Sequence, residues 1–220
     1  MTLLEAIDAR HSVRRYKDEP IPAEVREALG KALAEFNEKG GLHMQILYDE
    51  PGCFHSPMAH YGHFENVTNY ISVVGEKADD LDERAGYWGE MLALTAQTLG
   101  LNTCWVALTR GKSMAEVKKG EKEAIILSLG YGVYPGREHT SKPAGELSDI
   151  SDDAPDWYKA GVAAAMKAPT AVNQQKFRIT HEGNAVSVKI PKIGPCLKID
   201  LGIVKCHFAL GAGEENFRWV

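Results

Sequence analysis

The sequence lacks the features that would assign a chain of this size to an oxidising compartment, a membrane or nucleic acid. Its four cysteines form no Cys-x-x-Cys pair, and its first residues lack the basic start and apolar run of a signal peptide. No apolar run approaches the roughly 20 residues that cross a bilayer. The net charge of -5 gives no positive field for nucleic acid or an anionic membrane. We therefore expect a soluble, cytoplasmic protein with reduced thiols and neither of these partners.

The chain does contain enough apolar material for a sizeable core, since 44% of its 220 residues are hydrophobic. Its hydrophobic spacing predicts helices over residues 2–10, 22–36 and 79–99, strands over 44–48, 69–75 and 102–108, and an apolar run within 123–131. Residues 49–65, rich in Gly, Pro and His, are typical of a long surface loop. Two capping boxes, Thr2 to Glu5 and Ser113 to Glu116, indicate helix starts.

A polar stretch rich in glycine and proline, residues 132–155, has the composition of a connector between two packed units. We place the boundary there, which gives a first subdomain over 1–145 and a shorter second one over 146–220. The second contains a predicted helix over 155–166, a hairpin over 177–188 and a helix over 201–212. Both parts follow the order helix, loop, strand, and the segment from Tyr87 to Met91 resembles that from Asp200 to Val204. We infer a diverged internal duplication.

The segment Arg10-His11-Ser12-Val13-Arg14 brings three potential cations and one hydroxyl within a single turn. Guanidinium forks and short donors suit a phosphate dianion. The same residues could instead cap the carbonyls at a helix C-terminus, where basic side chains are also favoured. The pattern alone leaves both interpretations open.

The segment from Ala168 to Gln175 lies between a predicted helix and a predicted strand and presents one hydroxyl and three primary amides. Amides both donate and accept hydrogen bonds, which suits the uracil-like edge of an isoalloxazine ring. Alternatively, these side chains only satisfy nearby backbone groups, as polar loop residues often do.

Taken together, these two segments resemble motifs of the nitroreductase family of FMN enzymes. The family has an Arg-x-Ser-x-Arg type motif after the first helix, a Pro-Ser-x-x-Asn-x-Gln-Pro-Trp type motif after the next, and Gly-Leu-x-x-x-Trp at the end of the central helix. The corresponding segments here are 10–14, Pro169-Thr170-Ala171-Val172-Asn173-Gln174-Gln175-Lys176-Phe177, and Gly100-Leu101-Asn102-Thr103-Cys104-Trp105. The Pro-Trp end is replaced by Lys176-Phe177, which puts contacts beyond Gln175 in doubt.

One departure from the family concerns the position of the Pro-Thr segment, which here lies in the second half of the chain. The usual place, after the second helix, holds residues 36–41 instead. The resemblance is closest to tandem-duplicated members, in which one chain mimics the usual homodimer. It implies an α+β, nitroreductase-like fold: an antiparallel-rich sheet packed with helices, in two related subdomains that form a pseudo-dimer. It also implies one FMN per chain, with the site complete in one chain, whether monomer or homodimer.

The resemblance carries over roles by position. Those that would hold the FMN phosphate are Arg10, Ser12 and Arg14, with His11. Those that would line the ring are Pro169, Thr170, Ala171, Asn173 and Gln175. The backbone after the central helix, at Trp105, Val106, Ala107 and Leu108, would approach the ring, although Trp105 could equally belong to the core. A further cation, Lys142 or alternatively Arg137, would reach the phosphate.

The implied reaction is an exchange of hydride through flavin N5, with no catalytic side chain. NADH or NADPH would reduce FMN and leave, and a small electron acceptor such as a nitroaromatic or a quinone would enter the same pocket. A Gly-x-Gly-x-x-Gly fingerprint is absent from the sequence, so we expect the nicotinamide to bind only transiently. The alternative is a non-catalytic protein that binds or senses flavin.

A rival site is suggested by Cys53, His55, His60 and His63, which supply zinc ligand types within one segment. Their spacing matches none of the common zinc patterns, and the same segment could form the edge of a pocket instead. His207, on the last predicted helix, is expected to be a satisfied core or boundary residue rather than a ligand.

Overall fold

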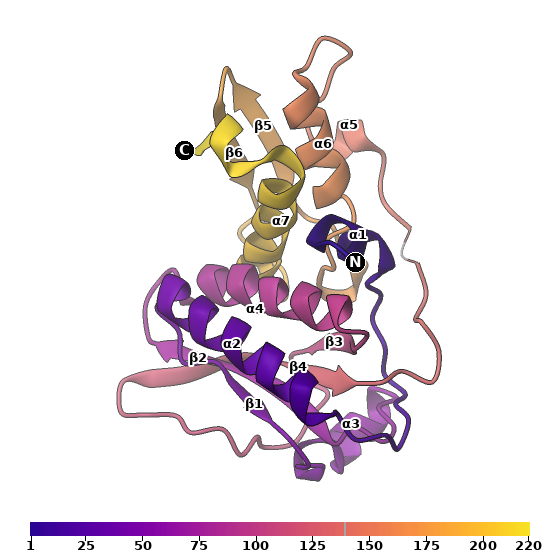
Figure 1. The fold of residues 1–220 in the computed structure, drawn as a ribbon. Helices are drawn as coiled ribbons and strands as arrows, with labels where there is room; N and C mark the ends of the chain where they lie inside the picture. The colour runs from indigo at the N-terminus through magenta and orange to yellow at the C-terminus, as the bar shows by residue number, and fades with distance from the viewer. Residues whose placement is uncertain (139) are drawn as a thin grey trace.

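The computed structural model describes residues 1–138 and 140–220, and its lower half is built on a four-stranded antiparallel sheet (Figure 1). The strand order is β1-β2-β4-β3. The strands are β1 (Gln45–Leu47), β2 (Asn69–Glu76), β3 (Asn102–Val106) and β4 (Glu121–Gly130). Seven of the eight β2 residues are buried. A strand buried on both sides requires cover on both faces of its sheet.

Helix α4 (Leu81–Thr98) covers one face of this sheet, and α2 (Ala23–Gly40) packs beside it. The other face is covered by the segment that follows α1 (Leu3–Ala9), together with η1 (Gly52–Phe54) and α3 (Pro57–Tyr61). We call this second cover of the sheet the second layer. Alternate residues of β2 face opposite sides of the sheet: Ile71 and Val73 face α4, whereas Tyr70 faces the second layer.

The second layer corrects the prediction of a surface loop over residues 49–65. Cys53, Phe54 and Ala59 are buried in it, and Ser56 caps α3 by accepting a hydrogen bond from the Ala59 amide at 3.2 Å. Few apolar side chains stand among the Gly, Pro and His residues of this segment, so its sequence has no clear period. Burial against the sheet, rather than local propensity, makes it ordered.

The two capping boxes have opposite outcomes. The prediction at Thr2 is confirmed, since the Thr2 amide donates to Glu5 Oε2 at 2.7 Å and the Glu5 amide donates to Thr2 Oγ1 at 3.2 Å. The prediction at Ser113 is wrong, because residues 111–118 form no helix. There the Ser113 hydroxyl bonds to the Glu123 carboxylate, and the Glu116 amide donates to Gln45 Oε1 at 2.9 Å. Contacts with the sheet replace the local cap.

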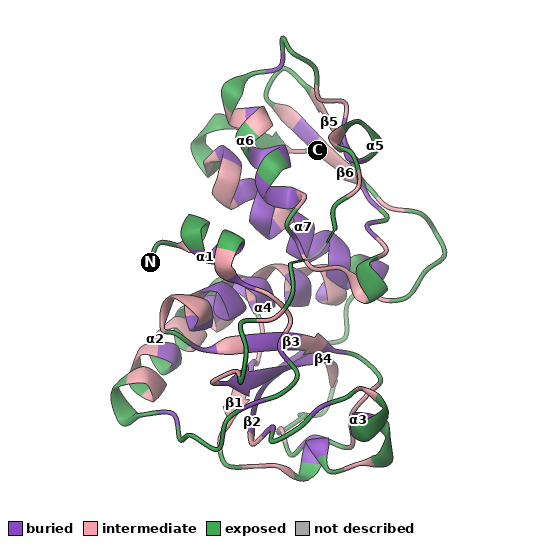
Figure 2. Ribbon diagram, turned by 90° about the vertical axis from the view of Figure 1, so that its right-hand side faces the viewer, coloured by how far each residue is buried: buried purple, intermediate pink, exposed green. Residues whose placement is uncertain are grey.

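The upper half contains helices α6 (Asp156–Ala165) and α7 (Leu197–Ala212) and a small sheet. The predicted hairpin is confirmed as β5 (Arg178–Glu182) and β6 (Ala185–Lys189). The short β7 (Arg218–Trp219) pairs parallel with β6 and was not predicted. Helix α7 begins four residues before its predicted start and is buried along most of its length (Figure 2). One short helix, α5 (Ala144–Leu147), lies within the predicted connector.

Helices α4 and α7 join the two halves through a reciprocal glycine contact. A Cβ on Gly86 would lie 2.1 Å from the Ile199 carbonyl oxygen, and a Cβ on Gly202 would lie 2.0 Å from that of Glu83. The same 116 positions separate Gly86 from Gly202 and Glu83 from Ile199. In the match of the Tyr87–Met91 segment with the Asp200–Val204 segment, the counterpart of Gly202 is Gly89, which lies three residues after Gly86. Only glycine permits this approach of two helix backbones.

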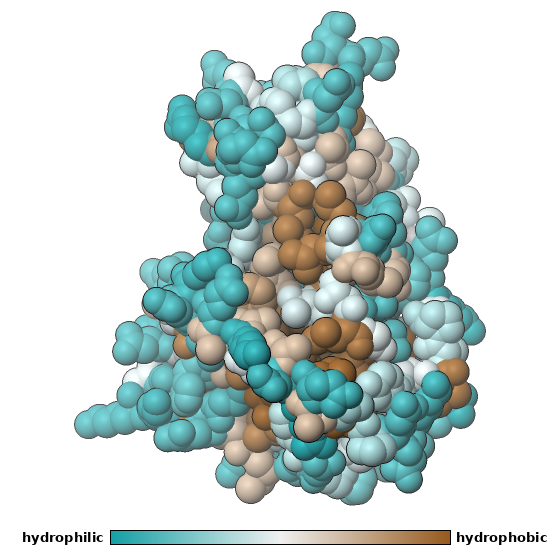
Figure 3. All heavy atoms as spheres, in the orientation of Figure 1, coloured by the Kyte–Doolittle hydropathy of each residue, from teal (hydrophilic) through white to brown (hydrophobic). Residues whose placement is uncertain are grey.

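Helix α1 lies against both α4 and α7. Its buried side chains, Ala6 and Ile7, form a cluster with Leu94 of α4 and Cys206 of α7. Figure 3 shows apolar side chains gathered on this face, where the two halves meet. Within the described residues, no helix is long and apolar enough to cross a membrane.

Candidate functional site

The Arg-Ser segment is extended and lies along the sheet rather than in a single turn. Ser12 forms a parallel bridge with Thr103 of β3, and the Val13 amide donates to the Thr103 carbonyl at 3.1 Å. Val13 is buried in the second layer, where the Tyr16 hydroxyl donates to its carbonyl at 2.8 Å. In an extended chain successive side chains alternate, so Ser12 and Arg14 point away from this core.

Three neighbouring cavities share Ser12 and Arg14 as lining residues. The smallest, of about 260 Å³, brings the two sequence motifs together. It is lined by Arg10, His11, Ser12, Arg14, Arg137, Pro169, Thr170, Val172 and Asn173. The second, of about 510 Å³, is lined by Ser12, Arg14, Arg15, His63, Tyr134 and Arg137. The third, of about 690 Å³, is described below.

Among the described residues, three arginines and no carboxylate line the smallest cavity, so its field favours an anion. The Arg10 side chain is only 3% exposed; its Nε faces the Glu90 carboxylate, and its Nη1 is buried without a hydrogen-bond partner among the described residues. A donor left unpaired in a buried guanidinium is costly, and a bound anion would satisfy it. Gly136, at φ +89°, lies so close to His11 that a Cβ on it would be 2.6 Å from the His11 Cβ, and this contact brings the next residue, Arg137, to the cavity.

The buried carboxylate of Glu90 on α4 holds Arg10 and Trp105 in place. Its Oε1 lies 3.3 Å from Arg10 Nε and 2.9 Å from His207 Nε2, and its Oε2 accepts from Trp105 Nε1 at 2.7 Å. Burial raises the pKa of Glu90, but Arg10, His207 and Trp105 outweigh it and hold the pKa below its usual value. His207 also reaches the Ala164 carbonyl at 3.1 Å, so both its ring nitrogens have partners, as expected for a core histidine.

The largest cavity, of about 690 Å³, lies between β3 and the first turns of α7. Most of its walls are apolar, including Trp105, Leu108, Ile199 and Ile203. Its other lining residues are Ser12, Arg14, Tyr61, Gly62, His63, Cys104, Ala107, Thr109, Ile125, Pro169, Thr170, Ala171, Val172, Pro195, Cys196 and Asp200. A pocket of this size and apolar character is typical of a site for a small planar molecule.

Of the residues expected after the central helix, Trp105, Ala107 and Leu108 line this cavity, whereas the Val106 side chain is buried in the second layer. Trp105 has contacts on two sides. It lines the cavity, and it also packs on α4, where a Cβ on Gly89 would lie 2.7 Å from the ring.

The Pro-Thr loop that borders the two cavities has a strained backbone. Val172, Asn173 and Gln175 have φ angles of 49°, 53° and 45°, a left-handed region that costs non-glycine residues about 1–3 kcal/mol each. Val172 is also 89% exposed, although it is apolar. Strain of this kind persists where surrounding contacts fix the backbone, often at ligand sites.

Asp200 of α7 supplies those contacts. Its carboxylate accepts from the Ala171 amide at 3.0 Å and from Gln174 Nε2 at 2.7 Å. Burial raises the pKa of Asp200 to about 6, although both hydrogen bonds act to lower it. The sequence analysis did not single out Asp200 or Glu90. A charged residue in a helix rich in small and apolar residues was the only local signal for either.

The structure brings only part of the predicted amide set to the cavities. Asn173 lines the smallest one, with its Nδ2 donating to the Thr140 carbonyl at 3.1 Å. Gln175 is buried away from all three, and its Nε2 donates to Thr140 and to Asn173 Oδ1, both at 2.9 Å. Its Oε1 accepts from the Lys142 amide at 2.8 Å.

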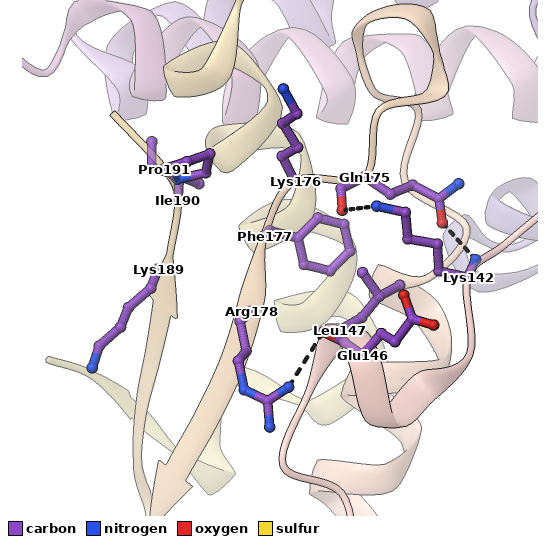
Figure 4. A pocket seen from close by; sticks show the side chains of 10 residues that line it. All are labelled: Lys142, Glu146, Leu147, Gln175, Lys176, Phe177, Arg178, Lys189, Ile190 and Pro191. Carbon is purple, nitrogen blue, oxygen red and sulfur yellow. Dashed lines mark hydrogen bonds between the residues drawn. The ribbon is translucent and has the colours of Figure 1, made fainter. Parts of the chain in front are cut away.

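Lys142 lies with Gln175 in a separate cavity of about 430 Å³ (Figure 4). Its Nζ donates to the carbonyls of Gln174 at 3.0 Å and Gln175 at 3.4 Å. Of the two cations considered for the phosphate, the structure therefore places Arg137 at the smallest cavity and Lys142 behind the loop.

The rival zinc site does not form in the part of the chain that the structure describes, where no cluster of three His, Cys, Asp or Glu side chains could hold a metal. Cys53 is buried, its Sγ donates to the Gly111 carbonyl, and burial raises its thiol pKa to about 11. A high pKa disfavours the thiolate that zinc requires. His55, His60 and His63 are exposed, and His63 alone among them lines the cavities, at their edge.

Comparison with known proteins identifies the family of this chain and supports its fold. Residues 2–212 match the family model described as "Putative TM nitroreductase". A "putative nitroreductase" from Thermotoga maritima is 24% identical with a TM-score of 0.73, and the match covers 98% of this chain and 85% of that one. A "putative nitroreductase in complex with FMN" from Desulfovibrio desulfuricans is 18% identical with a TM-score of 0.55, over 70% and 99% of the two chains. No curated protein matches. The expected α+β fold, with an antiparallel sheet packed against helices, is confirmed.

Proposed function

The chain belongs to the nitroreductase family, and from this premise we propose that it is an FMN-dependent oxidoreductase with its flavin in the cavities between β3 and α7. The observation that carries the proposal is the junction of the two motifs. Residues 10–12 and 14 are far apart in sequence from residues 169, 170, 172 and 173, and they line one cavity whose charged groups, among the described residues, are all cationic.

The smallest cavity fits the phosphate of FMN. Arg14 and Arg137 provide charge from exposed positions, and Arg10 provides an unpaired buried donor, Nη1. Ser12, at the boundary of all three cavities, adds a hydroxyl. Bidentate guanidinium groups and short donors are the groups that bind phosphate dianions most strongly.

The largest cavity fits the isoalloxazine ring and, above it, a second flat molecule. Trp105 and Ile203 provide apolar walls that exclude water, and Thr170 with the backbone of the strained loop provides polar groups at one edge. Asp200 fixes that loop through the Ala171 amide. Gln175 and Lys142 would act behind the loop by holding its shape rather than by touching the flavin.

When bound, FMN supplies reversible hydride transfer between NADH or NADPH and a small electrophile such as a nitroaromatic or a quinone. The described residues around the cavities include no paired acid and base, so their part is to bind, orient and exclude water. A single pocket that admits first the donor and then the acceptor supports a ping-pong order. A protein from Clostridium acetobutylicum described as a "putative NADH oxidase" shares this fold, at 18% identity and a TM-score of 0.50, over 68% of this chain and 99% of that one.

We further propose that the chain is a pseudo-dimer with one FMN site. The reciprocal Gly86 and Gly202 contacts give α4 and α7 equivalent surroundings, as two-fold related helices would have. The phosphate residues come from the first subdomain and the loop residues from the second, so one chain supplies both sides of the site.

The test is to purify the protein and follow its flavin spectrum. We expect a yellow protein with one FMN per chain, bleached by NADH or NADPH and re-oxidised by a nitroarene or a quinone. A flavin that is bound but never reduced by either nicotinamide would indicate the alternative, a flavin-binding or sensing protein. A colourless protein that does not take up added FMN would contradict both.

A further inference from the structure

A further cleft, of about 550 Å³, is lined by residues of α4, of α7 and of the chain after α7. Four aromatic side chains and five charged ones line it. They are Tyr87, Trp88, Phe217 and Trp219, with Asp80, Glu83, Arg84, Lys205 and Glu214. We call it the α4 cleft, because five of the nine residues belong to α4 or to its N-cap.

The glycine contacts relate this cleft to the proposed flavin cavity. Adding 116 positions to Asp80, Glu83, Arg84 and Tyr87 gives Cys196, Ile199, Asp200 and Ile203. Those are the residues through which α7 and its N-cap line the large cavity. The same offset relates Gly86 to Gly202 and Glu83 to Ile199, in contacts that are independent of either cavity.

The opposite walls correspond less closely, since 114 rather than 116 positions separate Trp105 from Trp219. Trp105, on the strand that follows α4, lines the large cavity, and Trp219, on the strand that follows α7, lines the α4 cleft. Gly89 lies against the Trp105 ring, and its counterpart at the same offset, Lys205, has its Nζ 5.1 Å from the centre of the Trp219 ring. Both sites therefore combine one turn of a central helix with a tryptophan from the other half.

The chemistry of the α4 cleft differs from that of the flavin cavity because its cations are already paired. Arg84 bonds to Asp80 at 3.1 Å and to the Gly40 and Gly41 carbonyls at 2.7 and 2.9 Å. Lys205 pairs with Glu83 at 2.5 Å. Glu214 accepts from the Tyr87 hydroxyl at 2.9 Å. The cleft therefore has three carboxylates and two cations, and because both cations are already paired, neither is available to bind a phosphate. The aromatic rings remain partly exposed.

We propose that the α4 cleft binds a planar aromatic molecule that carries no phosphate, in contact with Trp219 and Trp88. The cleft is the counterpart of the flavin cavity in its place on the helix pair, but it excludes FMN by charge. A neutral or cationic ring system gains contact with Trp219 and Trp88, and the Glu214 carboxylate beside them accepts only a tyrosine hydroxyl, whereas a phosphate dianion meets a surface of net negative charge.

The probe is lumiflavin, which has the ring of FMN without the ribityl phosphate. Equilibrium dialysis of the FMN-loaded protein should detect one bound lumiflavin per chain, and added FMN should not bind as a second equivalent. Trp219→Leu should weaken lumiflavin binding about tenfold through the lost ring contact. Glu214→Trp, which adds bulk at an exposed position of the cleft, should abolish it, and Glu215→Trp, next to the cleft, should not change it.

The flavin content of each variant separates this proposal from the proposed function, because none of these residues lines the FMN cavities. Lumiflavin binding that survives both Trp219→Leu and Glu214→Trp would place it elsewhere and overturn the proposal. A second equivalent of FMN would overturn the charge argument. A dimer in light scattering that Glu214→Trp dissociates would show that a second copy of the chain covers the cleft instead, and would also overturn it.

Discussion

Arg10, Arg14 and Arg137 line the same cavity but differ in what else holds them. Arg10 is buried against Glu90, so replacing it would leave a carboxylate with only His207 and Trp105 as partners. Arg14 is exposed, with its guanidinium 5.9 Å from the Phe64 ring. The exposed Arg137 can be changed without opening the core. The two rim arginines are therefore the cleaner probes of a phosphate.

We predict that Arg137→Ala weakens FMN binding by about 1.5–3 kcal/mol, the cost of one charge-assisted hydrogen bond. Riboflavin, which lacks the phosphate, should bind the variant and the unchanged protein equally. Both affinities are measured by fluorescence titration of the apoprotein. Lys142→Ala is the comparison variant: it should affect FMN and riboflavin alike, because Lys142 holds the loop rather than the phosphate. An FMN-specific loss in Lys142→Ala alone would reverse this assignment.

Asp200 gives a prediction for pH. Its pKa is about 6 in the folded protein, whereas an exposed aspartate titrates near 3.9. Between about pH 4 and pH 6 the folded state therefore keeps a proton that the unfolded chain has released. The stability contributed by this proton is present below about pH 4 and is lost as the pH rises to 6.

Asp200→Asn should remove this dependence. Relative to the variant, the unchanged protein should lose about 2 kcal/mol of unfolding free energy between pH 4 and pH 6.5. Urea denaturation of both proteins at several pH values and one FMN concentration measures the difference. Parallel pH profiles would mean that the Asp200 carboxylate titrates as it does in the unfolded chain.

The site residues differ in how far the sequence could predict them. Arg10, Ser12, Arg14 and the Pro-Thr loop follow from short motifs, and the structure brings them together. Glu90 and Asp200 belong to no motif, because their partners lie far away in sequence: 80 positions separate Glu90 from Arg10, and 29 separate Asp200 from Ala171. Such pairings depend on how helices pack, and a local pattern does not contain that information.

At the level of elements, helices and strands with a clear hydrophobic period were predictable. Helix α2 and strand β2 lie within a few residues of their expected bounds. The segments that were predicted wrongly or not at all are those that become ordered through tertiary contacts. Residues 49–65 become ordered by covering the sheet, Ser113 bonds to Glu123 instead of capping a helix, and β7 is too short to show any period. In each case tertiary packing outweighs local propensity.

The crossing of α4 and α7 predicts a sharp difference between two glycines. Gly202→Ala places a Cβ against a backbone carbonyl that cannot turn away, so α4 and α7 must separate, and we expect a loss of about 1–3 kcal/mol of unfolding free energy. Gly30→Ala is the matched control. It lies exposed within α2 with nothing within 4 Å of the added Cβ, and it should gain about 1 kcal/mol from helix propensity. Equal effects of the two changes in urea denaturation would contradict the contact.

At the scale of the whole molecule, the proposed pseudo-dimer predicts that FMN binding does not depend on association between chains. The fraction of protein that holds FMN, at a fixed concentration of free FMN, should stay constant over about a hundredfold dilution of the protein. Flavin fluorescence and light scattering on the same samples measure retention and mass. A site shared between two copies would instead lose flavin as the copies separate.

The glycine contact between α4 and α7 also affects how small molecules enter and leave the pocket. The Trp105 wall is fixed to α4 by Glu90 and Gly89, and the Ile199 and Ile203 wall belongs to α7, whose backbone touches that of α4. The distance between the walls is therefore fixed by the contact between the two helix backbones, and we expect no hinge motion between the halves. Small molecules should therefore enter and leave at the exposed rim of the cavity, around His63, rather than through a change in the distance between the two halves.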